Sequence, residues 1–172
     1  MIKEIPAAFL AAAYWLHMLA TVAWIGGLAS MALIVLPAAR KTLDTQAYAS
    51  FLGRVQERLQ QVGWLSLIIL GATGMFQMSA SPHYEGLLAI VNPWAVAILS
   101  KHVAILLMVA VSAYSTWGLM PAMRRMALLR SAGRDVPESE SARLAGRELL
   151  ALRLNLVLSL VVLALTAWAR SS

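Results

Sequence analysis

Four long apolar stretches, separated by more polar segments, dominate the pattern of hydrophobic and polar positions along the chain. They cover residues 6–36, 59–80, 93–120 and 149–169. Each is long enough for an α-helix to cross a hydrocarbon core, which takes about 20 residues. We therefore predict an all-α integral membrane protein whose residues 1–172 form one domain, a four-helix bundle with up-down-up-down topology.

The composition agrees with membrane insertion and excludes several kinds of chemistry. Apolar residues make up 60% of the chain and charged residues only 13%, whereas soluble domains have about 45–50% and about 25%. The first stretch is about twice as long as the apolar core of a signal peptide, so we expect it to remain as a span. The absence of cysteine excludes disulfides, iron–sulfur clusters and thiolate metal sites. No internal repeat is evident to the eye.

The distribution of positive charge predicts the orientation in the membrane, because cytoplasmic loops collect Lys and Arg. Such residues are concentrated in two of the loops, namely Arg40, Lys41, Arg54 and Arg58 in the first and Arg124, Arg125, Arg130, Arg134, Arg143, Arg147 and Arg153 in the third. We expect these loops in the cytoplasm, both termini on the outer side, and the protein in the inner membrane. Topology and anionic lipid headgroups account for the net charge of +6, so no nucleic-acid partner is expected. Residues 124–148 are predicted to form a linker between short helix extensions.

Two histidines are predicted to lie at one depth in the bundle. His17 lies roughly 16 Å along the first span and His102 roughly 13 Å along the third, at 1.5 Å per residue. Because these spans are parallel and can sit diagonally, both rings can point inward, as the two axial ligands of a haem b require. Trp24 shares a face with His17 and is placed to pack beside the macrocycle. Glycines that would give the macrocycle room are Gly26, Gly27, Gly63, Gly71 and Gly74.

Each polar group also has a simpler interpretation. An intramembrane histidine can merely hydrogen-bond a neighbouring helix, and glycines can merely allow close packing. Lys101 points about 100° away from His102 round the helix, so the two side chains cannot aim at the same atom. Its ammonium either reaches toward the outer interface, as lysines near helix ends do, or meets a haem propionate or an anionic substrate.

Three segments resemble the CopD family, membrane proteins named for copper resistance. They are "HMLATVAWIGGLASMALIVLPAAR", "LGRVQERLQQVGWLSLIILGATGMFQM" and "PWAVAILSKHVAILLMVAVSAYSTWGLMPAMRR". The shared pieces are His17, Trp24 with Gly26 and Gly27, Pro37, Thr73 with Gly74, and Lys101. The chain is also similar to the HemJ-type protoporphyrinogen oxidases, haem-b bundles with a first-span His and a third-span Lys. The HemJ pattern at the end of span one is replaced here by "MALIVLPAARK", so this resemblance extends to His17 and Lys101 only.

The CopD resemblance implies copper, and soft ligands for it are present. Met75 and Met78 lie near the outer end of the second span and His83 lies in the outer loop, so these three are an alternative copper site. Met120, Met123 and Met126 follow one another at spacings of three, where span three meets the cytoplasm. Thioethers suit Cu(I). Methionine is also an ordinary gap-filler in apolar packing.

Two functions therefore compete. The first is a membrane haem-b protein that transfers electrons, for example from quinol in the bilayer to an acceptor outside, with His17 and His102 as axial ligands. If it is an enzyme, it is a quinol- or porphyrinogen-linked oxidoreductase. The second is a copper permease or accessory protein. A weaker third is a subunit or homo-oligomer that anchors a larger membrane complex. The Asp and Glu residues all lie in loops or at span ends, so hydrolytic chemistry has no support.

Overall fold

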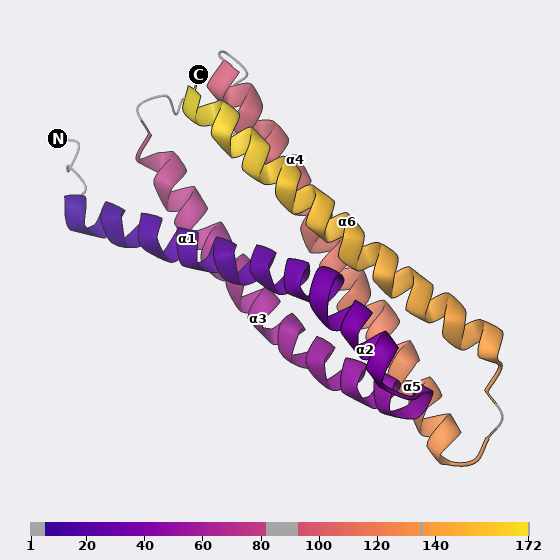
Figure 1. The fold of residues 1–172 in the computed structure, drawn as a ribbon. Coiled ribbons are helices and arrows are strands. Elements are labelled where there is room, and N and C mark those ends of the chain that lie inside the picture. The colour runs from indigo at the N-terminus through magenta and orange to yellow at the C-terminus, as the bar shows by residue number, and fades with distance from the viewer. Residues whose placement is uncertain (1–5, 82–92, 135, 172) are drawn as a thin grey trace.

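A computed structural model describes residues 6–81, 93–134 and 136–171, and every regular element in these ranges is helical (Figure 1). The elements are α1 (Ala7–Ser30), η1 (Met31–Val35), α2 (Leu36–Thr42), α3 (Thr45–Ser79), α4 (Pro93–Ala113), η2 (Tyr114–Leu119), α5 (Met120–Ser131) and α6 (Glu138–Ser171). They form four continuous rods that are long and apolar enough to cross a membrane: Ala7–Thr42, Ser50–Ser79, Pro93–Ser131 and Glu138–Ser171. The predicted all-α membrane bundle of four spans is confirmed.

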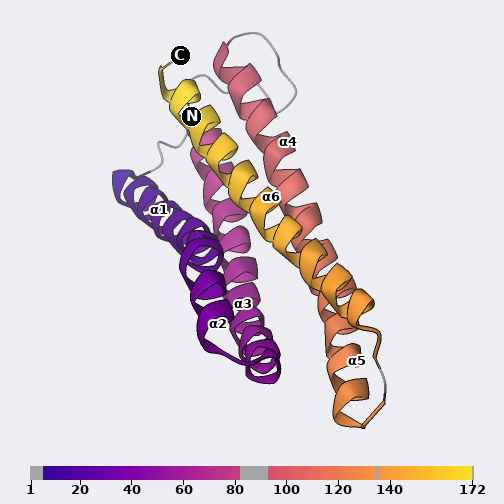
Figure 2. The ribbon, with the colours of Figure 1, turned by 45° about the vertical axis from the view of Figure 1, so that its right-hand side comes forward.

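The rods extend beyond the predicted spans at one end of the bundle. There α2 and α5 end and α6 begins, and we call it the basic end because Arg40, Lys41, Arg124 and Arg125 lie there. At the opposite end α1 and α4 begin and α6 ends (Figures 1 and 2). The predicted linker over 124–148 is mostly helix, since α5 continues to Ser131 and α6 already begins at Glu138.

The four rods are arranged as two hairpins. In the first α1 packs along α3, in the second α4 packs along α6, and α1 also touches α6 (Figure 2). Small residues allow the close approach, as is usual for helices in membranes. A Cβ on Gly27 would lie 2.7 Å from Leu59 Cδ1, and one on Gly63 would lie 3.1 Å from Trp24 Cζ3. The indole of Trp24 therefore lies directly against the α3 backbone.

The first and third rods share an unusual backbone feature. In each, a short π-helix precedes a proline, with η1 before Pro37 and η2 before Pro121. Each π segment closes on an i to i−5 bond, from the Leu36 amide to the Met31 carbonyl in one rod and from the Met120 amide to the Ser115 carbonyl in the other. A proline lacks its amide hydrogen and its ring crowds the carbonyl four residues earlier. The wider turn makes room for that ring while the rod stays continuous.

The two hairpins are related by an internal repeat that inspection of the sequence missed. The buried residues of α1 are Ala13, Ala20, Trp24 and Leu28, and those of α4 at the matching positions, 84 further on, are Ala97, Ala104, Met108 and Ser112. The second and fourth rods match as well, because "LSLIILGATG" at 65–74 aligns with "LSLVVLALTA" at 158–167. The repeat is not evident to the eye because different side chains fill equivalent positions. His17 corresponds to Lys101, and Thr73 corresponds to Thr166.

Candidate functional site

His17 lies on the buried stripe of α1, between Ala13 and Ala20, and its ring contacts α3. Its Nδ1 is 2.8 Å from Thr73 Oγ1, and that hydroxyl donates its own hydrogen to the Ile69 carbonyl at 2.6 Å. Thr73 Oγ1 can therefore only accept from the ring, so Nδ1 carries the hydrogen. The Nε2 atom of the neutral imidazole is left with a lone pair, as a metal-binding histidine requires.

The ring of His17 is also fixed by what it packs against. A Cβ on Gly74 would lie 3.4 Å from His17 Cε1, so the imidazole lies in contact distance of the α3 backbone. Thr73 and Gly74 are consecutive in α3, and together they set the position and the tautomer of one ring. The structure thus brings together His17 and Gly74, two of the residues predicted for the cofactor site.

His102 occupies a different face of its helix. Its Nδ1 is 2.7 Å from the carbonyl of Ile98, one turn earlier, so Nδ1 donates and Nε2 again holds the lone pair. The buried stripe of α4 passes through Ala97, Ala104 and Met108, and Lys101 rather than His102 is in register with it. The residue on the inner stripe of α4 that corresponds to His17 is therefore Lys101.

Lys101 is half-buried and belongs to a group of positive charges at the end of the bundle where α6 ends. Its ammonium acts electrostatically on His17, and Arg170 acts on Lys101 in turn. The Arg170 guanidinium lies over the Tyr14 ring, 5.7 Å from its centroid. Within residues 6–81, 93–134 and 136–171, no carboxylate lies within ion-pair distance of Lys101.

The other predicted site residues lie apart from this group. Trp24 is buried, and its Nε1 donates to Ser159 Oγ at 3.0 Å, so it joins α1 to α6 while packing on Gly63 of α3. Met75 is 64% exposed and Met78 is only partly buried, so the structure does not turn both thioethers toward the bundle interior. His83 lies outside the described residues.

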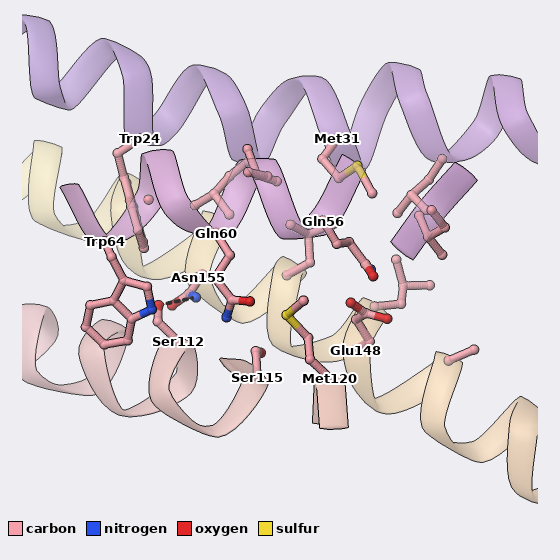
Figure 3. Close-up of a pocket in the computed structure, with 18 of the residues that line it drawn as sticks. Trp24, Met31, Gln56, Gln60, Trp64, Ser112, Ser115, Met120, Glu148 and Asn155 are labelled. Atoms are coloured by element: carbon pink, nitrogen blue, oxygen red, sulfur yellow. Dashed lines mark hydrogen bonds between the residues drawn. The ribbon is translucent and has the colours of Figure 1, made fainter. Parts of the chain in front are cut away.

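A second polar region, which sequence reasoning missed, lies between the two hairpins toward the basic end. It is a cavity of about 120 Å³, several times the 10–15 Å³ that one water needs. All four rods line it. Figure 3 shows Met31, Gln56, Met120 and Glu148 extending from four different elements into the same space. Gln56 lies close enough to Glu148 there to interact with its carboxylate.

The fourth rod supplies the most unusual groups of this cavity. Glu148 and Asn155 are seven residues apart in α6 and so share a face. Asn155 is only 5% exposed, and its Nδ2 donates to Ser112 Oγ at 3.1 Å. Its Oδ1 is the one buried side-chain polar atom without a hydrogen bond among the described residues. The i, i+7 spacing is the sequence signal that could have found this pair, but the apolar pattern places Glu148 among the loops and span ends.

The cavity fits some ligands better than others. Its volume is well below the roughly 300–1,000 Å³ of pockets for larger organic ligands, and neither His17 nor His102 lines it. In the part of the chain that the structure describes, no three His, Cys, Asp or Glu side chains come together as a metal cage. The interior donors present are instead thioethers, amide oxygens, single imidazoles and one carboxylate.

The rods and the interior polar groups define the class of protein, a four-span helical membrane protein with a polar interior. The family model described as CopD, copper resistance protein D, matches residues 53–169, so the chain belongs to the CopD family. No curated protein and no solved structure matches the chain. The predicted membership in the CopD family is confirmed, whereas the likeness to HemJ-type proteins gains no support from these comparisons.

Proposed function

We propose that this CopD family protein binds copper ions inside the membrane and conducts them along the axis of the bundle. One observation carries the proposal: soft donors turn inward at successive depths of the two matching rods. They are His17 near the middle of α1, Met108 in α4, and Met31 and Met120 toward the basic end. Met31 is 3% and Met108 is 4% exposed, so neither thioether faces lipid.

The chemistry of these donors suits Cu(I). Thioether sulfur and imidazole nitrogen are among the ligands that a soft monovalent ion prefers. Both are neutral, so holding them ready inside a membrane costs far less than burying charged ligands. From His17 to Met31 the path covers roughly 21 Å of helix. Separate sites of moderate strength allow an ion to enter and also to leave, which is a general requirement for conduction.

His17 is the entry ligand in this proposal. Thr73 holds its Nδ1 hydrogen, which presents Nε2 to the ion and removes the need to lose a proton on binding. With the basic end in the cytoplasm, as the positive-inside rule favours, His17 lies in the half of the bundle nearer the outside and the cavity lies in the cytoplasmic half.

The test is copper transport by the purified full chain in proteoliposomes. Cu(I) is supplied outside under anaerobic conditions, and a chromophoric Cu(I) chelator is trapped inside. The native protein is expected to load the chelator, and His17→Ala is expected to lose most of this activity. Met75→Leu, which alters an exposed thioether, is the matched control and should match the native rate. Native vesicles no faster than protein-free vesicles would contradict the proposal.

A second function, haem-b electron transfer between a quinol and an outer acceptor, is favoured by one observation. Both His17 and His102 use Nδ1 as a donor, so each retains an Nε2 lone pair suited to axial ligation of iron. Haem, if bound, would supply reversible one-electron chemistry. His17 and His102 would hold it only if α4 turned so that His102 replaced Lys101 on the inner stripe. Oxidised and dithionite-reduced visible spectra with iron analysis test it. A low-spin b-type spectrum lost in His17→Ala and in His102→Ala supports this function, and a featureless spectrum after expression with ample haem rejects it.

A further inference from the structure

Several of the hydrogen-bond donors that line the cavity between the hairpins are already bonded to acceptors of the protein. Trp64 Nε1 and Gln60 Nε2 both donate to Thr116 Oγ1, and Trp24 Nε1 donates to Ser159 Oγ. Ser112 Oγ donates to the Met108 carbonyl at 2.8 Å. These donor side chains line the space, yet their hydrogens point to partners of their own.

Electron-pair donors, by contrast, remain available in the cavity. The Oδ1 atom of Asn155 has no partner although the residue is only 5% exposed, and a buried acceptor left without a donor is destabilising. Glu148 adds a carboxylate that no cation pairs with among the described residues. Met31 and Met120 add two thioether sulfurs from opposite hairpins (Figure 3). Arg40 also lines the cavity, but it is exposed and its Nε donates to the Tyr48 hydroxyl at 3.3 Å. The more buried part of the lining therefore combines free lone pairs with one carboxylate, which is complementary to a cation.

We propose that this cavity is a binding site for one soft monovalent cation, Cu(I), with Met31, Met120 and Glu148 as ligands and Asn155 Oδ1 as a supporting oxygen. The inference rests on the proposed copper function and names a second station on the same path. The Glu148 carboxylate offsets the charge of the ion, and the other charged group of the lining, Arg40, is exposed. Ca²⁺ needs six to eight oxygens and Mg²⁺ near-octahedral oxygen geometry, so two thioethers among few oxygens disfavour both.

The backbone around the two sulfurs supports a built site. Met31 is the first residue of η1, and Met120 directly follows η2, so the thioethers flank the π segments of the two matching rods. Single π turns within helices are frequent at functional sites because they re-aim side chains. Gln56 of α3 lines the cavity beside Glu148 and is close enough to interact with its carboxylate. Each hairpin therefore contributes one sulfur, and the site is complete only when both hairpins are packed together.

The experiment is an anaerobic Cu(I) titration of the purified full chain against a competing chromophoric Cu(I) chelator. Met31→Leu and Met120→Leu keep the side-chain volume, and Glu148→Gln keeps the shape while removing the charge. Each should weaken this site by at least about tenfold, the lower end of the loss when one supporting group of a metal site is removed. The matched control is Met123→Leu, because Met123 packs in an apolar cluster away from the cavity lining. It should bind like the native chain.

X-ray absorption on the Cu(I)-loaded native chain provides a measurement that depends on no variant. We expect sulfur scatterers in the first coordination shell, and their loss in the double variant Met31→Leu with Met120→Leu. If the native chain binds Cu(I) with only nitrogen and oxygen scatterers, or if all cavity variants bind like the control, this site is wrong while the copper function stands. If the native chain neither binds nor transports Cu(I), the proposed function fails.

Discussion

The two hairpins share a scaffold and differ in chemistry. At equivalent positions of the first and third rods stand His17 and Lys101, and Trp24 and Met108. The equivalent threonines Thr73 and Thr166 both donate to a carbonyl four residues earlier, but Thr73 also accepts from a histidine.

This comparison separates what packing demands from what function demands. Small residues such as Ala20 and Ala104 recur at matching buried positions, because two membrane helices approach closely only over small side chains. The imidazole of His17, the ammonium of Lys101 and the carboxylate of Glu148 do not recur. A polar side chain found at only one of two equivalent positions is not required for the packing of the helices. Such side chains are therefore the first candidates for a functional role.

Replacing the largest asymmetric side chain should have the largest effect. Trp24→Ala removes an indole that packs on Gly63 and bonds Ser159 across the seam between hairpins, and should lower the free energy of unfolding by about 3–5 kcal/mol. Met108→Ala, at the equivalent position, should cost about 2–5 kcal/mol, because Met108 packs with Trp24 and Leu28 across the same seam but makes no hydrogen bond there through its side chain. Denaturant unfolding in detergent micelles measures both. Equal stability of Trp24→Ala and the native chain would contradict the packing described for α1.

The His17 and Lys101 pair should respond in opposite directions. His17→Ala should reduce Cu(I) flux into proteoliposomes by about 10- to 100-fold, because it removes the entry ligand. Lys101→Ala should maintain or increase flux, because a positive charge beside the path repels a cation. The same chelator-loaded vesicles measure both rates. Loss of flux in both variants would show that the two residues act as one unit and would contradict their separate roles as ligand and repelling charge.

The two threonines offer a finer comparison. Thr73→Val removes the acceptor that fixes the Nδ1 hydrogen of His17, and should weaken Cu(I) binding by about tenfold. Thr166→Val makes the same chemical change in the other hairpin, where the hydroxyl bonds only its own backbone, and should leave affinity unchanged. Competitive Cu(I) titration distinguishes them. A Thr166→Val loss as large as that of Thr73→Val would remove the argument for orientation of the ring.

The smallest expected effect concerns two glycines of α3. Gly71→Ala meets nothing within 4 Å and should stabilise the helix by up to about 1 kcal/mol through helix propensity. Gly63→Ala puts its methyl group 3.1 Å from Trp24 Cζ3 and should instead destabilise by about 1–3 kcal/mol. Thermal unfolding of both variants under identical detergent conditions checks the sign of each change.

The spans were predictable from the sequence because their length and apolarity are properties of single segments. Which face each residue presents was not, because nearly every position of an apolar rod is compatible with lipid. Depth alone therefore paired His17 with His102, whereas the buried stripe of α4 passes through Lys101. The cavity is lined by all four rods, and no single segment predicts that Glu148 and Asn155 line the same space as Met31 and Met120.

The concentration of helix contacts within each hairpin has a consequence for biogenesis. In each hairpin the two helices pack mainly on each other. The first hairpin can therefore insert into the bilayer and pack before the second hairpin has been synthesised. The seam between the hairpins then closes last, held by few anchors such as the Trp24 indole on Ser159. Because the cavity lies in that seam, a bound ligand would enter after insertion is complete. It would then stabilise the packing of the two hairpins against each other.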